Sequence, residues 1–375
     1  MHAITRLTLE NFRNYAALEL VVSPRPVIIT GPNGAGKTNI LEAVSLLAPG
    51  RGFRGAQLRQ MDALSGGGKP WVVGAQIDSH GEEIWVGTGR DAEAAMDKRI
   101  VKINGVKQAQ QSALSEVLGL QWLTPQMDSV FLEGNSARRK LLDRLVSLFD
   151  GSHPARITHY ERAVRERMAL LTGYSTPDTA WLNILEQEMA GLSVAISLAR
   201  QEAMGHISQA MHAMPSDFPH AYWSLSGQVE EALAKTSHAL DAEAQLAGAL
   251  CAARALDKAA GRSSVGAHKS TLSVVHAGKG MPAETCSTGE QKACLLSIVI
   301  AAGLARNAFK GSPPVLLLDE VIAHLDVDKR KSLFELLLGA GIQAWLTGTD
   351  ASDFSGFTAH VTHLQLAAGT LVVQG

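Results

Sequence analysis

The chain has 375 residues, of which 46% are hydrophobic and 19% are charged, so it can bury a sizeable core and is not expected to be disordered. Its formal net charge of −2 argues against a surface that is basic throughout, and any nucleic-acid site is therefore expected to be local. The 3 cysteines form no C-x-x-C pair and no apolar stretch is judged long enough to cross a bilayer, which predicts a cytoplasmic protein without a membrane partner.

The first elements are predicted to be strands. Residues 4–10 and 16–22 alternate apolar and polar side chains, as in a β-hairpin that turns around residues 11–15. A third strand, over 26–30, leads directly into a glycine-rich segment.

That segment matches G-x-x-x-x-G-K-[ST], the pattern of a nucleotide phosphate-binding loop, and reads Gly31, Pro32, Asn33, Gly34, Ala35, Gly36, Lys37, Thr38. Glycines let the backbone curl so that its N–H groups face phosphate oxygens. Lys37 is predicted to reach the β- and γ-phosphates, and the Thr38 hydroxyl to hold a bridging Mg²⁺. A helix from Lys37 would add a favourable field for anions at its N-terminus.

The elements after this loop change character twice. Strands are predicted over 71–77, 84–88, 99–103 and 121–125, with a turn at Asn104-Gly105. From 136 to about 214 the spacing is helical, with helices over 154–172 and 179–212 and a break at 173–177. At 1.5 Å per residue the longer helix would extend about 50 Å, which predicts an inserted arm.

The remainder of the chain returns to alternating strands and helices. The predicted elements are a strand at 221–226, a helix at 228–257, a strand at 271–275 within loops, a helix at 289–309, a strand at 314–319, a helix at 327–340, and strands at 343–347, 359–365 and 370–374. We therefore expect an α/β head built from 1–134 and 221–375, with a helical domain inserted at 135–220.

Two acids follow a fully apolar strand near the C-terminus, Asp319 and Glu320. The carboxyl end of a parallel strand is where open sheets place their ligands. Asp319 is predicted to hold Mg²⁺, and Glu320 to act as the general base that deprotonates the attacking water. The alternative for Asp319 is a simple cap on a helix from Val321.

A second candidate anion site is Ser287-Thr288-Gly289-Glu290-Gln291, immediately before a helix. A serine hydroxyl, a flexible glycine and a helix N-terminus can bind an anion. Taken alone, the same residues also fit an ordinary helix start with a glutamate in the first turn.

Together these motifs resemble the ATP-binding-cassette head in its SMC-like branch. In that family S-x-G-[EQ] is a signature that acts in trans, which implies that Ser287, Gly289 and Glu290 of one subunit close over the ATP γ-phosphate held by another. The resemblance therefore implies ATP and Mg²⁺ as ligands and an ATP-dependent homodimer.

Three further positions follow from this resemblance. Gln126 lies where the family has its metal-contacting Q-loop, and Asp326 ends the segment 323–326 at the D-loop position. The switch position, 347–350, reads T-G-T-D and lacks the histidine with which the family senses the γ-phosphate.

Within that branch the chain is similar to the RecF family over most of its length. The resembling segments are 7–15, 31–43, 49–54, 103–105, 138–143 and 316–320. Where that family usually reads G-P-H-R-D-D-L, residues 266–272 read G-A-H-K-S-T-L, and no role is carried onto them.

The resemblance implies a head that dimerises on ATP, binds DNA in that state and releases it on hydrolysis. Relatives act with RecR and RecO to place RecA on single-strand gaps coated with SSB. The DNA would be duplex, a junction of single and double strands, or single-stranded; with 5% aromatic residues the chain shows no stacking platform, which favours backbone contacts to duplex or junction.

Four basic clusters are candidates for these contacts, although each also fits a solvated surface. They are Arg51, Arg54 and Arg59; Arg138, Arg139, Lys140 and Arg144; Arg162, Arg165 and Arg167; and Lys329, Arg330 and Lys331. Arg138 and Arg139 have a second interpretation as structural residues.

Other classes of protein remain as alternatives. The ATPase subunit of a transporter would need a stacking aromatic before the phosphate loop and a switch histidine. A structural SMC protein would need much longer coiled coils, and an overcoming-lysogenization-type nuclease a C-terminal nuclease domain. A phosphotransfer kinase would leave Ser287–Glu290 without a purpose.

Overall fold

The computed structural model describes residues 2–63, 66–91, 97–173, 178–214, 218–322, 325–354, 357, 361–367 and 370–374. The chain divides into two compact units. Unit 1 consists of Met1–Asp128, Ala213–Phe218 and Leu295–Gly375; unit 2 consists of Ser129–His212 and Pro219–Cys294. Unit 2 thus also holds residues 221–294, beyond the inserted domain expected at 135–220, and those domain boundaries stay a prediction.

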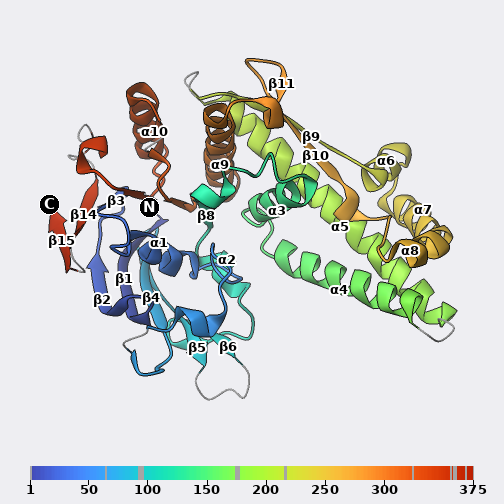
Figure 1. Ribbon diagram of the computed structural model, residues 1–375, viewed down its shortest axis with the longest axis horizontal. Coiled ribbons are helices and arrows are strands. Elements are labelled where there is room, and N and C mark those ends of the chain that lie inside the picture. The colour runs from blue at the N-terminus through green and yellow to red at the C-terminus, as the bar shows by residue number, and fades with distance from the viewer. Residues whose placement is uncertain are drawn as a thin grey trace. The chain divides into compact units, whose positions relative to one another are not determined.

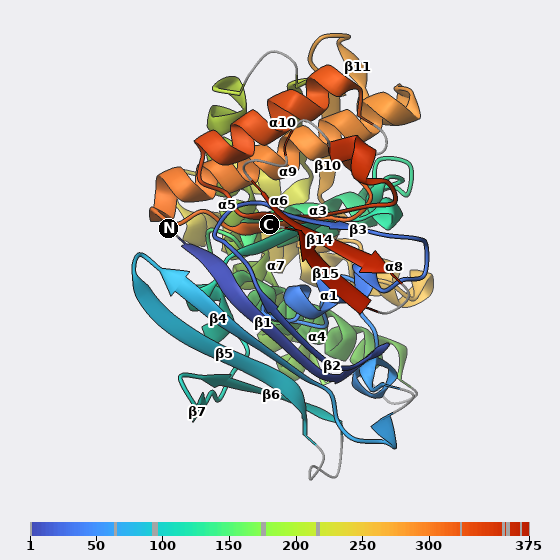
Figure 2. The ribbon, with the colours of Figure 1, turned by 90° about the vertical axis from the view of Figure 1, so that its left-hand side faces the viewer.

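The N-terminal part of unit 1 forms an antiparallel sheet, visible as the blue and cyan strands of Figure 2. Its strand order is β2-β1-β4-β5-β6-β7. The strands are β1 (His2–Phe12), β2 (Tyr15–Val21), β4 (Val72–Ser79), β5 (Glu82–Asp91), β6 (Lys98–Ile103) and β7 (Val106–Lys107). The predicted hairpin is confirmed, because Phe12 pairs with Tyr15 across its turn.

The second sheet of unit 1 draws strands from both ends of the chain, in the order β15-β14-β3-β13-β12-β8. The strands are β3 (Val27–Thr30), β8 (Leu120–Leu123), β12 (Val315–Leu318), β13 (Ala344–Gly348), β14 (Thr362–Ala367) and β15 (Thr370–Gln374). All neighbours are parallel except β14 and β15. The carboxyl ends of β3, β13, β12 and β8 therefore meet at one edge.

Helix α1 (Lys37–Ser45) belongs to the same core as both sheets. Its fully buried Ile40 and Leu41 share that core with Leu7 of β1 and Leu317 of β12. The other helical elements described in unit 1 include η1 (Leu58–Met61), α2 (Ala113–Val117), η3 (Pro125–Met127), α10 (Val327–Gly339) and η7 (Ala351–Phe354).

Unit 2 is built around the long helix α5 (Thr179–His212), which packs against α4 and α7 (Figure 1). Its other helices are α3 (Asn135–Val146), α4 (His153–Thr172), α6 (Gln228–Lys235), α7 (Ala239–Ala252), α8 (Arg254–Ala260), η4 (Ala267–Lys269) and η5 (Ala283–Thr285). A small antiparallel sheet joins β9 (Ala221–Ser226), β10 (Thr271–His276) and β11 (Met281–Pro282).

Helix α9 (Thr288–Lys310) begins in unit 2 and continues into unit 1, which resumes at Leu295. By length and composition it could cross a bilayer, so the expectation that no apolar stretch reaches that length was wrong. However, 67% of its most apolar window is buried inside the protein, as in the core helix of a globular fold.

Two other element predictions differ from the structure or cannot be compared with it. The single helix predicted at 228–257 is wrong, because α6, α7 and α8 divide this stretch. Thr236 leaves helical geometry at φ −115° and ψ 147°, since a β-branched residue followed by serine and histidine favours an extended break. Residues 174–177 of the predicted break, and 359–360 of a predicted strand, lie outside the described residues.

Candidate nucleotide-binding site

The glycine-rich loop joins the end of β3 to the start of α1, as its sequence pattern predicts. Gly31 has φ +149°, and a Cβ there would lie 2.4 Å from the Leu366 carbonyl oxygen. Gly36 has φ +107°, and a Cβ there would lie 2.5 Å from Asn14 Nδ2. Both positions therefore require glycine.

Lys37 lies beneath this loop. Its Nζ donates hydrogen bonds to the carbonyls of Gly31 at 2.6 Å and Pro32 at 3.0 Å, and the residue is 4% exposed. Burial lowers the pKa of the Lys37 ammonium, while the carboxylates of Glu320 and Asp319 oppose that shift. The positive charge is thus aimed at the loop and lies within the field of both acids.

The β1–β2 turn supports the loop from the other side. Tyr15 Oη donates to the Gly36 carbonyl at 3.2 Å, and burial raises the pKa of this phenol to about 12, so it stays protonated. Asn39 Nδ2 donates to Asn14 Oδ1 at 2.7 Å. The sequence predicted this segment as a hairpin turn and as part of the family resemblance, but its support of the loop could not be deduced from spacing.

Helix α1 is fixed by a buried carboxylate that sequence reasoning also left without a role. Glu42 is fully buried and pairs with Arg13 at 2.5 Å and with Arg54 at 2.9 Å. Arg54 also donates to Asn39 at 2.9 Å. Arg54, a candidate DNA contact, is therefore engaged in holding the first helix.

The two acids follow β12, at the edge where the phosphate loop follows β3. Thr38 Oγ1 donates to Asp319 Oδ1 at 3.2 Å, which brings the two predicted metal ligands together. The Asp319 N–H bonds to the carbonyl of Leu123 at the end of β8. The Asp319 carboxylate accepts hydrogen bonds from the hydroxyls of Thr38 and Thr347. This side chain therefore does not act as the helix cap that was the alternative interpretation.

Gln126 also lies beyond this edge, in η3 just after β8 ends at Leu123. Its side chain is exposed. Parallel pairing of Leu123 with Leu318 brings the ends of β8 and β12 side by side. A metal contact by Gln126 stays a prediction.

The signature residues lie in unit 2, at the start of α9. Ser287 and Gly289 are exposed. Glu290 accepts the Ser287 backbone N–H at 3.0 Å and pairs with Lys279 at 2.5 Å. The Lys279 ammonium and the Ser287 bond lower the pKa of Glu290 to about 2, so the carboxylate is ionised at neutral pH.

Asp326 is the N-cap of α10. Its Oδ1 accepts the Lys329 N–H at 2.9 Å, and its Oδ2 pairs with Lys329 Nζ at 2.7 Å. This is a structural role, and a D-loop role for Asp326 stays a prediction. Residues 323 and 324 of the predicted D-loop lie outside the described residues.

Most of the candidate DNA-contact arginines are already engaged. Arg138 donates to the carbonyls of Leu272 and Phe131, and Arg139 to that of Ser270, which supports their structural interpretation. Arg59 pairs with Asp97, and Arg167 is fully buried in an ion-pair network. These contacts favour the solvated or structural interpretation for much of the four clusters.

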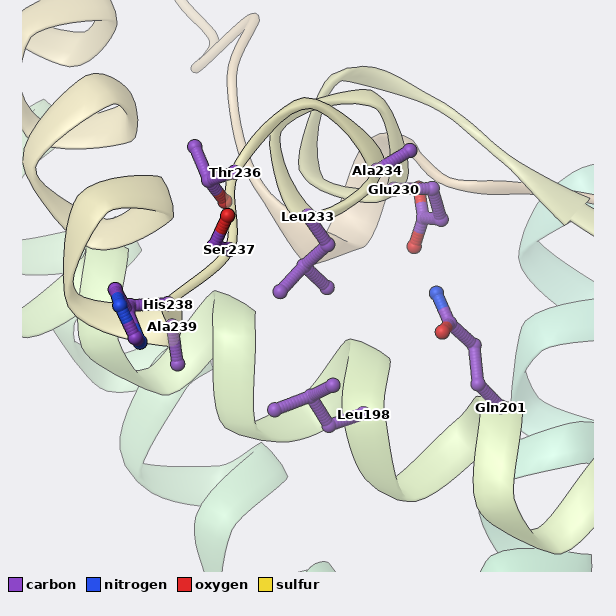
Figure 3. Close-up of a pocket in the computed structure, with 9 residues that line it drawn as sticks. All are labelled: Leu198, Gln201, Glu230, Leu233, Ala234, Thr236, Ser237, His238 and Ala239. Atoms are coloured by element: carbon purple, nitrogen blue, oxygen red, sulfur yellow. The ribbon is translucent and has the colours of Figure 1, made fainter.

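A pocket of about 330 Å³ lies within unit 2 (Figure 3), and none of the predicted site residues line it. Leu198 and Gln201 of α5 face Leu233 and Glu230 of α6 across it. The Glu230 carboxylate accepts hydroxyl hydrogen bonds from Ser197 and Ser270, so its charge is satisfied within the unit. The pocket therefore does not compete with the loop as a nucleotide site.

Comparisons with known proteins agree with this geometry. Residues 3–354 match the family model described as the RecF/RecN/SMC N terminal domain. A "DNA replication and repair protein RecF" of Mesorhizobium japonicum is 42% identical over 98% of this chain and 97% of its own length. The protein of the same name in Rhizobium etli is 41% identical, over 98% of each chain.

The chain belongs to the RecF family. Its fold also matches a solved structure described as the recombination mediator protein RecF-ATPrS in the RecFOR pathway, with a TM-score of 0.86 at 21% identity over 100% of this chain and 98% of that chain. An Smc head domain from Pyrococcus furiosus matches with a TM-score of 0.54 at 16% identity, over 100% of this chain and 96% of that chain. The chain therefore has a RecF-type head fold, and its membership of the RecF family argues against the alternative that it is the ATPase subunit of a transporter.

Proposed function

We propose that this RecF-family protein is an ATP-dependent DNA-binding ATPase of replication and recombinational gap repair. The observation that carries the proposal is the meeting of Thr38 with Asp319 directly after the phosphate loop, in a chain 42% identical to a DNA replication and repair protein. The loop and its Thr38 hydroxyl lie near the N-terminus, whereas Asp319 lies near the C-terminus. Contact between such a hydroxyl and an acid beside a phosphate loop is the arrangement that triphosphate hydrolysis needs.

The residues present fit ATP and Mg²⁺. Positive φ values at Gly31, Gly34 and Gly36 give the curled backbone that exposes N–H groups to phosphates. Thr38 and Asp319 offer hard oxygen donors for Mg²⁺, with Gln126 as a further oxygen ligand. Mg²⁺, when bound, supplies charge neutralisation between the β- and γ-phosphates.

In the proposed reaction Lys37 binds the phosphate oxygens and Glu320 orients and deprotonates the attacking water. Glu320 follows the metal-side Asp319 and is partly exposed at the sheet edge, so its carboxylate can reach solvent. Hydrolysis to ADP and phosphate would end the ATP-bound state and release the DNA.

The proposed active state is a homodimer in which Ser287, Gly289 and Glu290 close over the γ-phosphate of the partner copy. Exposure of Ser287 and Gly289 at a helix N-terminus supports this, because such a surface can accept an anion without unfolding. DNA, as duplex or junction, is the proposed cargo, with mediators of the RecR and RecO type as partners in a cytoplasmic protein.

Sedimentation velocity with and without ATP, and with and without gapped DNA, tests this function. The expected result is a monomer that becomes a dimer with ATP and retains gapped DNA only in that state. Lys37→Ala should stay monomeric and release DNA, whereas Lys102→Ala, an exposed lysine of β6, should behave like the parent. Nucleotide-independent retention by all three proteins would contradict the proposal.

A further inference from the structure

Thr347 lies at the carboxyl end of β13, between the strand that precedes the phosphate loop and the strand that precedes the acids. Strand β13 pairs in parallel with β3 on one side and with β12 on the other. The residue is fully buried. Its place in the sheet brings its hydroxyl to the edge where Asp319 and Glu320 emerge.

That one hydroxyl bonds to both acidic residues. Thr347 Oγ1 donates to Asp319 Oδ1 at 2.7 Å and accepts the Glu320 backbone N–H at 2.9 Å. The main-chain N–H of Glu320 can only donate, so the hydroxyl accepts that bond and its single proton is left to bond to Asp319. Thr347 therefore ties the carboxylate of Asp319 to the main chain of Glu320.

Glu320 needs such a restraint because of its backbone. Its φ is +55°, in the left-handed region that residues with a Cβ rarely adopt. Strained positions of this kind persist only when surrounding contacts hold them. The bond from its N–H to Thr347 is a contact that holds the peptide in this orientation.

We propose that Thr347 is a positioning residue: its hydroxyl fixes the left-handed turn at Glu320, which aims the general base, and it keeps Asp319 on the metal side with Thr38. The inference rests on the proposed ATPase function. It also gives the segment 347–350 a role that needs no switch histidine, because the hydroxyl acts through the acids.

The test compares variants of the full chain. Thr347→Val keeps the shape and removes the hydroxyl, and Thr347→Ala is a second hydroxyl-free variant should valine not fold. Thr347→Ser keeps the hydroxyl. The matched control is Thr88→Val, since Thr88 is itself buried in β5 and its hydroxyl also makes two bonds, to the Ile100 carbonyl and from Arg99, outside the site.

Single-turnover hydrolysis and ATP binding are then measured for each variant. Thr347→Val should slow hydrolysis by about tenfold or more, while the dissociation constant for ATP changes by less than about threefold. Thr347→Ser should restore the rate to within about threefold, and Thr88→Val should match the parent. Combined with Glu320→Gln, Thr347→Val should add less than about twofold, because both changes act on one base.

A parental rate in Thr347→Val, a serine variant as slow as valine, or additive losses with Glu320→Gln would each overturn the inference. Crystal structures without nucleotide supply an independent readout. The parent should keep a positive φ at Glu320, and the valine variant should lose it; an unchanged Glu320 in that variant overturns the inference. A parent that never hydrolyses ATP overturns the proposed function instead, and the structures still decide on Thr347.

Discussion

Both units bury charged side chains, but the two clusters are arranged differently. In unit 2 Arg167 is fully buried and donates to Glu186 at 2.9 Å, to Asp257 at 2.7 Å and to the Leu250 carbonyl at 2.7 Å. In unit 1 the buried Lys37 donates to two main-chain carbonyls, and Asp319 is held by hydroxyls.

The difference teaches how to recognise a binding site among buried charges. The charge of Arg167 is balanced by carboxylates of its own unit. This network therefore stabilises the fold and leaves no unpaired charge on Arg167 for a ligand. Lys37 and Asp319 bond to neutral groups, which would leave a positive and a negative charge available to the proposed phosphate and metal ligands. Both clusters are buried. They differ in that Arg167 bonds to carboxylates, whereas Lys37 bonds to neutral main-chain carbonyls.

The largest expected effect is on Lys37. Lys37→Ala removes the positive charge beneath the glycine-rich loop and should reduce ATP hydrolysis by about a thousandfold or more, since an electrostatic group on the transferred phosphate is lost. Steady-state hydrolysis and thermal unfolding would check this. Near-parental hydrolysis would show that the buried charge of Lys37 is structural, like that of Arg167 in unit 2.

Arg167→Leu tests the other side of the comparison. It should lower the free energy of unfolding by about 3–5 kcal/mol, because Asp257 is left buried without its cationic partner. Chemical denaturation measures the loss, and Arg162→Leu, an exposed position on the same helix, should change little. If Arg167→Leu unfolds like the parent, the network is not what stabilises unit 2.

Glu320→Gln sharpens the assignment within unit 1. It should bind ATP normally and slow hydrolysis by about a hundredfold, because the amide cannot accept a proton from water. Sedimentation with ATP should then show accumulated dimer. A monomer under those conditions would count against a composite site.

Ser287→Arg probes the exposed start of α9 in unit 2. A bulky cation there should leave ATP binding intact and weaken the ATP-dependent dimer by about tenfold or more, since it blocks a helix N-terminus that must approach phosphate. Ser237→Arg, an exposed serine elsewhere in unit 2, is the control. Equal dimerisation of both variants would remove the signature assignment.

The smallest expected effect is pH dependence at Glu290. The Lys279 ammonium holds its folded pKa near 2, below the ordinary value of 4.5, so the pair stabilises α9 above pH 4.5 and is lost as the pH falls toward 2. An NMR titration of the Ser287 amide should show this low inflection, absent in Glu290→Gln. An inflection near 4.5 would contradict the pairing.

Local patterns allowed much of unit 1 to be predicted from the sequence. The phosphate loop, its flanking strand and the apolar strand before Asp319 each need only short-range information. The break at Thr236 was missed because alanine- and leucine-rich helical spacing on both sides of it was given more weight than the local preference of Thr236 for an extended conformation. The bonds of Thr347 were missed because they depend on which strand lies beside which, and no spacing of residues along the chain encodes that.

The position of β3 has a consequence for the growing polypeptide. Both neighbours of this strand, β13 and β14, come from the C-terminal end, since β3 ends at Thr30 and β13 begins only at Ala344. During synthesis β3 therefore waits with both edges unpaired until almost the entire chain has emerged. A chain that stops before Ala344 lacks both neighbours of β3 and therefore cannot complete the sheet beside the glycine-rich loop.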